Sequence, residues 1–138
     1  MRDYDIKMSQ FNITQWRQRE LVAYFRQYPE LKKELIEIAL IDSPELSDSP
    51  RASTSSNPTE KCAIRRLYLL EKIENIDKAI QAIADKDYQE IIRQNLCYKR
   101  KLRSLQCKFP WLNCSGFYRS RRQAIVNLDY ILTQKNSP

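Results

Sequence analysis

The feature of this sequence that most constrains its fold is the near absence of glycine. Gly116 is the one glycine among 138 residues. Sheets and hairpins usually need glycine at turns and bulges, whereas helices exclude it because it costs backbone entropy. Leu, Ile, Lys, Arg, Gln and Glu, which favour helices, are abundant. The sequence therefore predicts an all-α fold, and its length fits one ordinary domain.

The N-terminal part of the chain, residues 1–41, is expected to form a helical arm. Apolar residues recur there at three- and four-residue steps from about Thr14 onward, which predicts an amphipathic helix. Pro29 interrupts this pattern, so we expect either two helices or one helix kinked at Tyr28–Pro29. Residues 42–58 contain six serines and three prolines, a composition typical of a linker.

A long helix is expected over residues 59–84. Asn57 can cap it, and Pro58 suits its first position. Its apolar residues step by 4, 3, 4 and 3, the spacing of a heptad seam. The seam consists of Leu69, Ile73, Ile76, Ile80 and Ile83. Such a seam serves equally well as a homodimer interface or as a packing surface for the N-terminal arm, and both alternatives stay open.

The C-terminal part, residues 85–138, is expected to form a helix-turn-helix. A short segment from Ser104 to Trp111 contains Pro110, so its helix must stop early or Pro110 must lie in the turn. A last helix is expected from about Cys114 to Leu132. Either Asn113 or Ser115 can cap this last helix, because both side chains accept hydrogen bonds from backbone N–H groups. The fold expected for the whole chain is thus a helical arm, a long central helix and a C-terminal helix-turn-helix.

Positive charge is concentrated in one segment. The whole chain has a net charge of +7, and residues 91–128 contain nine basic residues and no acidic ones. The remainder holds 24 − 9 = 15 basic and 17 acidic residues, a net charge of −2. A +9 segment beside a nearly neutral remainder is typical of a surface that binds a polyanion. Double-stranded DNA is therefore the expected partner.

The polar face of the last helix is the expected reading surface. Arg and Gln side chains suit the guanine and adenine edges in the major groove, and the first turns of a reading helix make such contacts. Base contacts are expected from Arg119, Arg122 and Gln123. Backbone contacts, which set affinity and register, are expected from Lys99, Arg100, Lys101, Arg103, Ser115, Tyr118 and Arg121.

Residues 113–125, Asn-Cys-Ser-Gly-Phe-Tyr-Arg-Ser-Arg-Arg-Gln-Ala-Ile, resemble the C-terminal signature of the RinA/ArpU family of phage transcriptional regulators. The Tyr28-Pro29 break and the Asn57-Pro58-Thr59 start are similar to two other elements of that family. Gly116 stands where the family has a more helix-friendly residue. The resemblance implies a C-terminal part similar to sigma factor region 4. It also implies activation of late genes of phages and prophages in Gram-positive bacteria.

Several classes of protein are disfavoured by composition. Histidine and glycine-rich phosphate loops are missing, so an enzyme is not expected. The cysteines, Cys62, Cys97, Cys107 and Cys114, include no Cys-x-x-Cys pair, so we expect no metal and no cofactor. Met1–Gln10 lacks the apolar core of a signal peptide, and no apolar run is long enough to span a membrane. A cytoplasmic location in the bacterial host cell is expected.

A sequence-specific DNA-binding transcriptional regulator, acting as an activator, is the function that these features favour. RNA polymerase is a further candidate partner. The alternative is a basic helical adaptor that binds a protein such as RNA polymerase without reading DNA. RNA binding is less favoured, because the aromatic-rich strand motifs of RNA-binding sheets are missing from the sequence.

Overall fold

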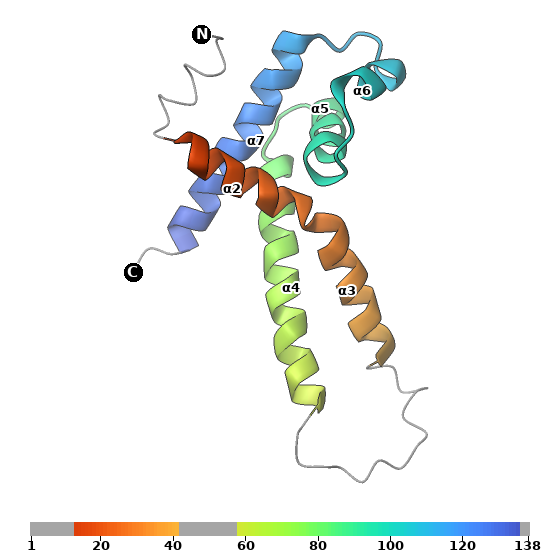
Figure 1. Ribbon diagram of the computed structural model, residues 1–138, viewed down its shortest axis with the longest axis vertical. Helices are drawn as coiled ribbons and strands as arrows, with labels where there is room; N and C mark the ends of the chain where they lie inside the picture. The colour runs from red at the N-terminus through yellow and green to blue at the C-terminus, as the bar shows by residue number, and fades with distance from the viewer. Residues whose placement is uncertain (1–12, 42–57, 136–138) are drawn as a thin grey trace.

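The structure is a computed structural model that describes residues 13–41 and 58–135. Every regular element in those two ranges is helical (Figure 1), which confirms the all-α prediction. The elements are α2 (Gln15–Arg26), α3 (Tyr28–Ile41), α4 (Pro58–Gln81), α5 (Lys86–Ile92), the π-helical segment η2 (Arg93–Cys97), α6 (Leu102–Lys108) and α7 (Cys114–Lys135). The linker expected at 42–58 and the cap expected at Asn57 lie outside the described residues, except for Pro58 at the start of α4.

The N-terminal arm forms two helices, α2 and α3. The Thr14 hydroxyl caps α2 by accepting a hydrogen bond from the backbone N–H of Arg17 at 3.1 Å. Gln27 alone separates the two helices, and Pro29 is the second residue of α3. Proline suits this first turn because it has no N–H to leave unpaired. Of the two alternatives for the Tyr28–Pro29 break, separate helices are therefore correct.

Helices α3 and α4 lie side by side and run in opposite directions (Figure 1). The heptad seam of α4 is buried along its whole length, and Leu69, Ile76 and Ile80 are 0% exposed. Helix α4 also packs against α7. The seam is thus covered by helices of the same chain, which favours the packing alternative. In this structure these residues leave no exposed face through which a homodimer can form.

The long helix ends at Gln81, three residues before the expected end at Ala84. The side-chain amide of Gln89 donates to the carbonyl of Ile83 at 2.7 Å and to that of Gln81 at 3.4 Å. This side chain satisfies carbonyls that a helix end leaves without partners. Asp85 then caps α5, where its carboxylate accepts two backbone N–H groups. The chain therefore turns sharply between α4 and α5.

A carboxylate in α4 joins this helix to α3 and η2. Asp77 accepts hydrogen bonds from the Tyr28 hydroxyl at 3.0 Å and from Arg93 at 2.8 Å. Burial raises the pKa of Tyr28 to about 12, against the lowering effect of Arg93. The same π turn buries Cys97, and burial raises the pKa of that thiol to about 12. Polar and apolar contacts together thus fix the position of η2.

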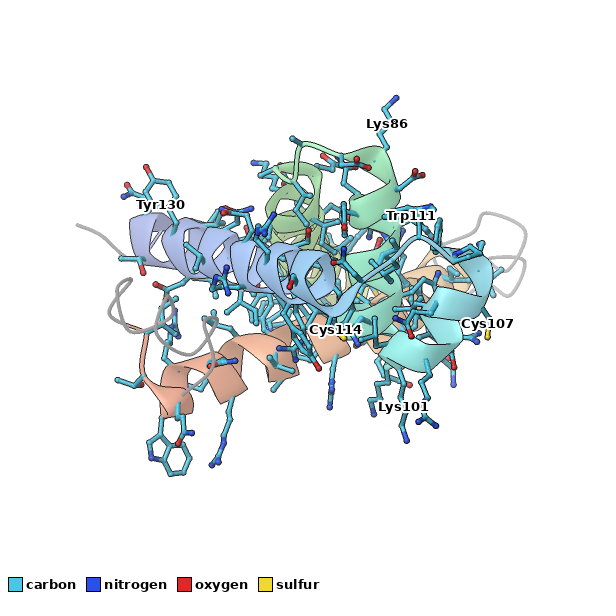
Figure 2. The ribbon with its side chains drawn as sticks, turned by 90° about the horizontal axis from the view of Figure 1, so that it is seen from above. Lys86, Lys101, Cys107, Trp111, Cys114 and Tyr130 are labelled. Carbon is cyan, nitrogen blue, oxygen red and sulfur yellow. The ribbon has the colours of Figure 1, made fainter. Side chains whose placement is uncertain are left out.

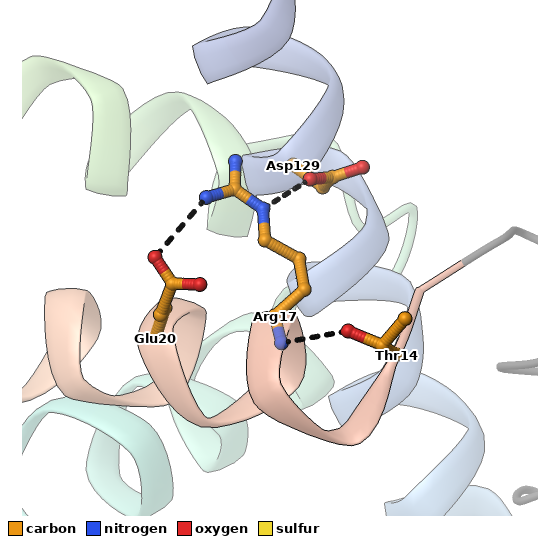
Figure 3. A network of polar contacts seen from close by, with 4 residues as sticks. All are labelled: Thr14, Arg17, Glu20 and Asp129. Carbon is orange, nitrogen blue, oxygen red and sulfur yellow. Dashed lines mark hydrogen bonds and ion pairs between the residues drawn. The ribbon is translucent and has the colours of Figure 1, made fainter.

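Helix α2 crosses α7 (Figure 1) and is bonded to it by a polar network (Figure 3). The Arg17 guanidinium donates to Asp129 on α7 at 2.7 Å and lies 3.8 Å from Glu20 on its own helix. Buried side chains from the arm, from α4 and from residues 85–128 belong to one hydrophobic cluster. The N-terminal arm is therefore packed against the C-terminal helices by a shared core.

Candidate nucleic-acid interface

One end of the molecule carries the region expected to bind DNA. It consists of the loop before α6, α6 itself, the connection 109–113 and the first turns of α7. Figure 2 looks onto this end and shows Lys101, Cys107, Trp111 and Cys114 around it. Pro110 lies in the connection between α6 and α7, where it cannot interrupt a helix. A short helix, a short connection and a long helix are thus present in the expected order.

The start of α7 is fixed by Asn113. Its side-chain oxygen accepts the backbone N–H of Gly116 at 2.7 Å, and its carbonyl accepts that of Phe117 at 3.1 Å. Of the two candidate caps, Asn113 is therefore correct, and Ser115 lies inside the helix. Gly116 has a steric role that the sequence did not reveal. A Cβ at this position would collide with the hydroxyl of Tyr88, which lies over the first turn of α7.

An exposed stripe runs along α7 from its first turn. Ser115, Arg119 and Gln123 follow one another at four-residue steps, and all three are exposed. Residues at this spacing lie on one face of a helix, each about 6 Å further along the axis. The Gln123 amide donates to Asn127 at 2.8 Å, so it is oriented along the same face. We call Ser115, Arg119 and Gln123 the α7 stripe.

Arg122 does not belong to this exposed face. Its side chain is buried, with 8% of its surface exposed. The expectation that Arg122 reads bases is therefore wrong for this conformation.

Tyr118 and Arg121 occupy the sides of α7 and are half-buried. The Tyr118 ring packs edge-on against Phe117, with 5.0 Å between the ring centroids. The Nε–H of Arg121 donates to the side chain of Asn95 in η2 at 3.0 Å. Neither residue lies on the α7 stripe. Both lie at the edge of the exposed face of α7, a position that suits a contact with the DNA backbone.

The basic loop before α6 is exposed throughout. Lys99, Arg100 and Lys101 in this loop lie at the surface, and so does Arg103 on the first turn of α6. The Asn95 amide donates to the carbonyl of Arg100 at 2.8 Å, so one side chain holds both this loop and Arg121. Lys99 has a φ of 61°, a left-handed conformation that costs a lysine about 1–2 kcal/mol. The loop and the first turn of α6 thus form a shaped structure that presents four positive charges beside α7.

Sequence reasoning missed two contributors to this end of the molecule. Trp111 in the connection is 51% exposed, although it packs edge-on against Tyr88 and Phe109. Arg19 and Arg26 on α2 line a groove together with Arg121, although they lie far from the basic segment in the sequence. An exposed aromatic in a polar connection is a weak sequence signal. The position of α2 gives no sequence signal at all.

The acid-free character of residues 91–128 carries over into the fold. Asp129, the first acidic residue after this segment, is paired with Arg17. The described ranges contain no group of three or more His, Cys, Asp or Glu side chains arranged to hold a metal. They also contain no helix that is long and apolar enough to cross a membrane. The exposed cations and hydrogen-bond donors of this end are suited to an anionic partner.

Comparison of the chain with family models, with curated proteins and with solved structures finds no match. The functional assignment therefore depends on the geometry and charge of this end of the molecule.

Proposed function

We propose that this protein is a sequence-specific, duplex-DNA-binding transcriptional regulator whose α6–α7 unit acts as a helix-turn-helix. The observation that supports this most strongly is the α7 stripe. It presents an arginine and a glutamine on the first turns of a helix that starts at an exposed end of the molecule. The major groove, about 12 Å wide, admits one helix in this way.

The spacing within the α7 stripe matches base readout. Arg119 and Gln123 are separated by about 6 Å along the helix axis, which is close to two base-pair steps of about 3.4 Å. Arginine donates two hydrogen bonds to guanine, and glutamine both donates to and accepts from adenine. Gln123 must exchange its bond with Asn127 for a bond with a base. The proposed roles are thus guanine recognition by Arg119 and adenine recognition by Gln123.

The basic loop supplies the backbone contacts in this proposal. Lys99, Arg100 and Lys101 lie just before α6, the helix that precedes the reading helix, and Arg103 lies on the first turn of α6. Contacts of this kind fix the register of the protein on the duplex but carry no sequence information. Ser115 on the first turn of α7 is placed to add a phosphate contact, supported by the backbone N–H groups of the helix start. Tyr118 and Arg121 act at the edges of the interface.

The biological role follows from the resemblance of residues 113–125 to the RinA/ArpU family. Under this proposal the chain activates late genes of a phage or prophage, and it acts in the cytoplasm of a bacterial host. The helical arm, the long α4 and the α6–α7 unit are compatible with that assignment. RNA polymerase is then a natural second partner, because an activator must engage the transcription machinery.

A selection experiment tests the proposed function. The purified protein is incubated with a library of randomised duplexes at physiological salt, and the retained DNA is sequenced. We expect one short motif to be enriched, and we expect Arg119→Ala with Gln123→Ala to abolish that enrichment. Arg66→Ala is the matched control, because Arg66 is an exposed arginine on α4, away from α7. Recovery without a motif by the unaltered protein would refute the proposal.

A second candidate function, that of a protein-binding adaptor, is favoured by one observation. The α3–α4 hairpin exposes apolar side chains that the core does not use: Ile36, Leu40, Ile64 and Leu67 are each more than 60% exposed. Large exposed apolar side chains on one helical hairpin are the kind of surface that a protein partner can cover. If Leu67→Asp removes binding to RNA polymerase while the protein selects no DNA motif, the adaptor function is correct and DNA reading is not.

A further inference from the structure

An open polar groove lies along α2 and reaches α7 at Arg121. Its volume is about 460 Å³. Three arginines and two glutamines line most of it, with two small apolar side chains between them. The polar lining residues are Gln15, Gln18, Arg19, Arg26 and Arg121. Among residues 13–41 and 58–135, no carboxylate lines this groove, so the chemistry of its described lining is that of guanidinium and amide donors, which suit phosphate oxygens.

The groove faces the end of the molecule that carries α6 and the start of α7. Arg121 lines it, whereas Asp129, two turns later on α7, is bound by Arg17. Arg19 follows Arg17 by two positions and thus lies about 200° further around α2. Helix α2 therefore crosses α7 between Arg121 and Asp129, with the groove on the N-terminal side of α7. Figure 1 shows α2 passing across α7.

The groove is also continuous with the basic loop. Arg121 is bonded to Asn95, and Asn95 in turn holds the carbonyl of Arg100. Four arginines lie around the crossing of α2 and α7: Arg17, Arg19, Arg26 and Arg121. Arg17 pairs with two carboxylates, so the net charge of these six side chains is 4 − 2 = +2. The positive potential of the loop therefore extends onto α2.

We propose that this α2–α7 groove binds the sugar-phosphate backbone of the same duplex whose bases α7 reads, so that the N-terminal arm is part of the DNA-binding surface. This inference rests on the proposed function. The proposed occupant is one strand of the duplex flanking the base pairs that α7 contacts. Arg19 and Arg26 are the residues that contact phosphate, and Arg121 adds charge from the floor of the groove.

The salt dependence of duplex binding tests this proposal. Affinity for the selected duplex and for a shuffled duplex is measured at several salt concentrations, for the unaltered protein and for Arg19→Gln/Arg26→Gln. Each lost phosphate contact reduces the steepness of log affinity against log salt by about 0.9. At 0.1 M salt this corresponds to about an eightfold loss per contact. The double variant should therefore show a slope about 1.8 shallower and an affinity up to about 60-fold lower for both duplexes.

A control with the same change of charge separates local contact from general electrostatics. Lys33→Gln/Arg66→Gln removes two exposed cations from the α3–α4 hairpin, at the other end of the molecule. Its slope should change little. Equal changes of slope in the two double variants would overturn the proposal for the groove but leave the proposed function standing. If the unaltered protein shows no preference between the duplexes, the proposed function fails, and the slopes still decide whether the groove binds phosphate.

Discussion

Replacing Gly116 by alanine tests the packing at the start of the proposed reading helix. Helix propensity alone predicts a gain of up to about 1 kcal/mol, because alanine favours a helix over glycine. The structure predicts the opposite sign, since a Cβ would collide with the Tyr88 hydroxyl and lie 3.1 Å from both the Tyr88 Cζ and the Asn113 side-chain oxygen. Forcing an extra methyl into a packed site costs about 1–3 kcal/mol. Moving the Tyr88 ring also weakens its edge-on contact with Trp111, worth about 0.5–1.5 kcal/mol.

The net expectation for Gly116→Ala is a loss of about 1–3 kcal/mol in the free energy of unfolding. Urea unfolding followed by circular dichroism measures it. Tyr88→Phe removes the oxygen responsible for the worst collision, so Gly116→Ala should be nearly neutral in that background. The double-mutant cycle then gives a coupling free energy of about 1–3 kcal/mol. A stabilised single variant, or a coupling of zero, would show that Tyr88 does not restrict this position.

Three further predictions concern the loop and the buried ionisable groups. Lys99→Gly should raise the free energy of unfolding by about 1 kcal/mol, because glycine adopts a φ of 61° without strain. The same change should weaken binding to all duplexes. An unchanged free energy of unfolding would contradict the left-handed backbone conformation of Lys99. A thiol reagent at pH 8 should modify the exposed Cys107 and Cys114 quickly, whereas Cys97, buried and with a pKa raised to about 12, should react only on unfolding. Because the pKa values of Cys97 and Tyr28 are both raised to about 12 in the fold, the unfolded chain loses these protons first. Their contribution to the free energy of unfolding is complete below about pH 9 and declines as the pH rises toward 12. The urea midpoint of the unaltered protein should therefore fall between these pH values, and that of Cys97→Ala/Tyr28→Phe should fall less steeply. An equally steep fall of the two urea midpoints with pH would contradict the raised pKa values.

The helices themselves follow largely from local sequence. Proline at a first turn, capping side chains and apolar periodicity placed α2, the α3 start and α4 within a few residues of where they lie. The end of α4 was misplaced because its termination depends on the Gln89 side chain, which returns from the next helix to cap it. The heptad seam alone did not distinguish packing within the chain from dimerisation. The answer depends on where α3 lies.

The candidate site was harder to predict, because it depends on how far one helix covers another. A helical wheel places Arg122 beside Arg119, but in the fold Arg122 is buried and Arg119 is exposed. The packing of α2 against α7 brings Arg19 and Arg26 beside Arg121, although the charge distribution along the sequence assigned no role to α2. Gly116 looked like an unfavourable helix residue until Tyr88 was seen to occupy the space of its side chain. Contacts between distant segments determine all three outcomes.

The measurement that most directly tests the central claim is the ratio of affinities for the selected duplex and a shuffled duplex, measured by fluorescence anisotropy at physiological salt. A base contact by arginine is worth about 1–3 kcal/mol, so Arg119→Ala should reduce this ratio by about 5- to 150-fold. Lys101→Ala should weaken both affinities equally and leave the ratio unchanged, because phosphate contacts carry no sequence information. A ratio that Arg119→Ala leaves intact, or that both variants reduce alike, would contradict base reading by the α7 stripe.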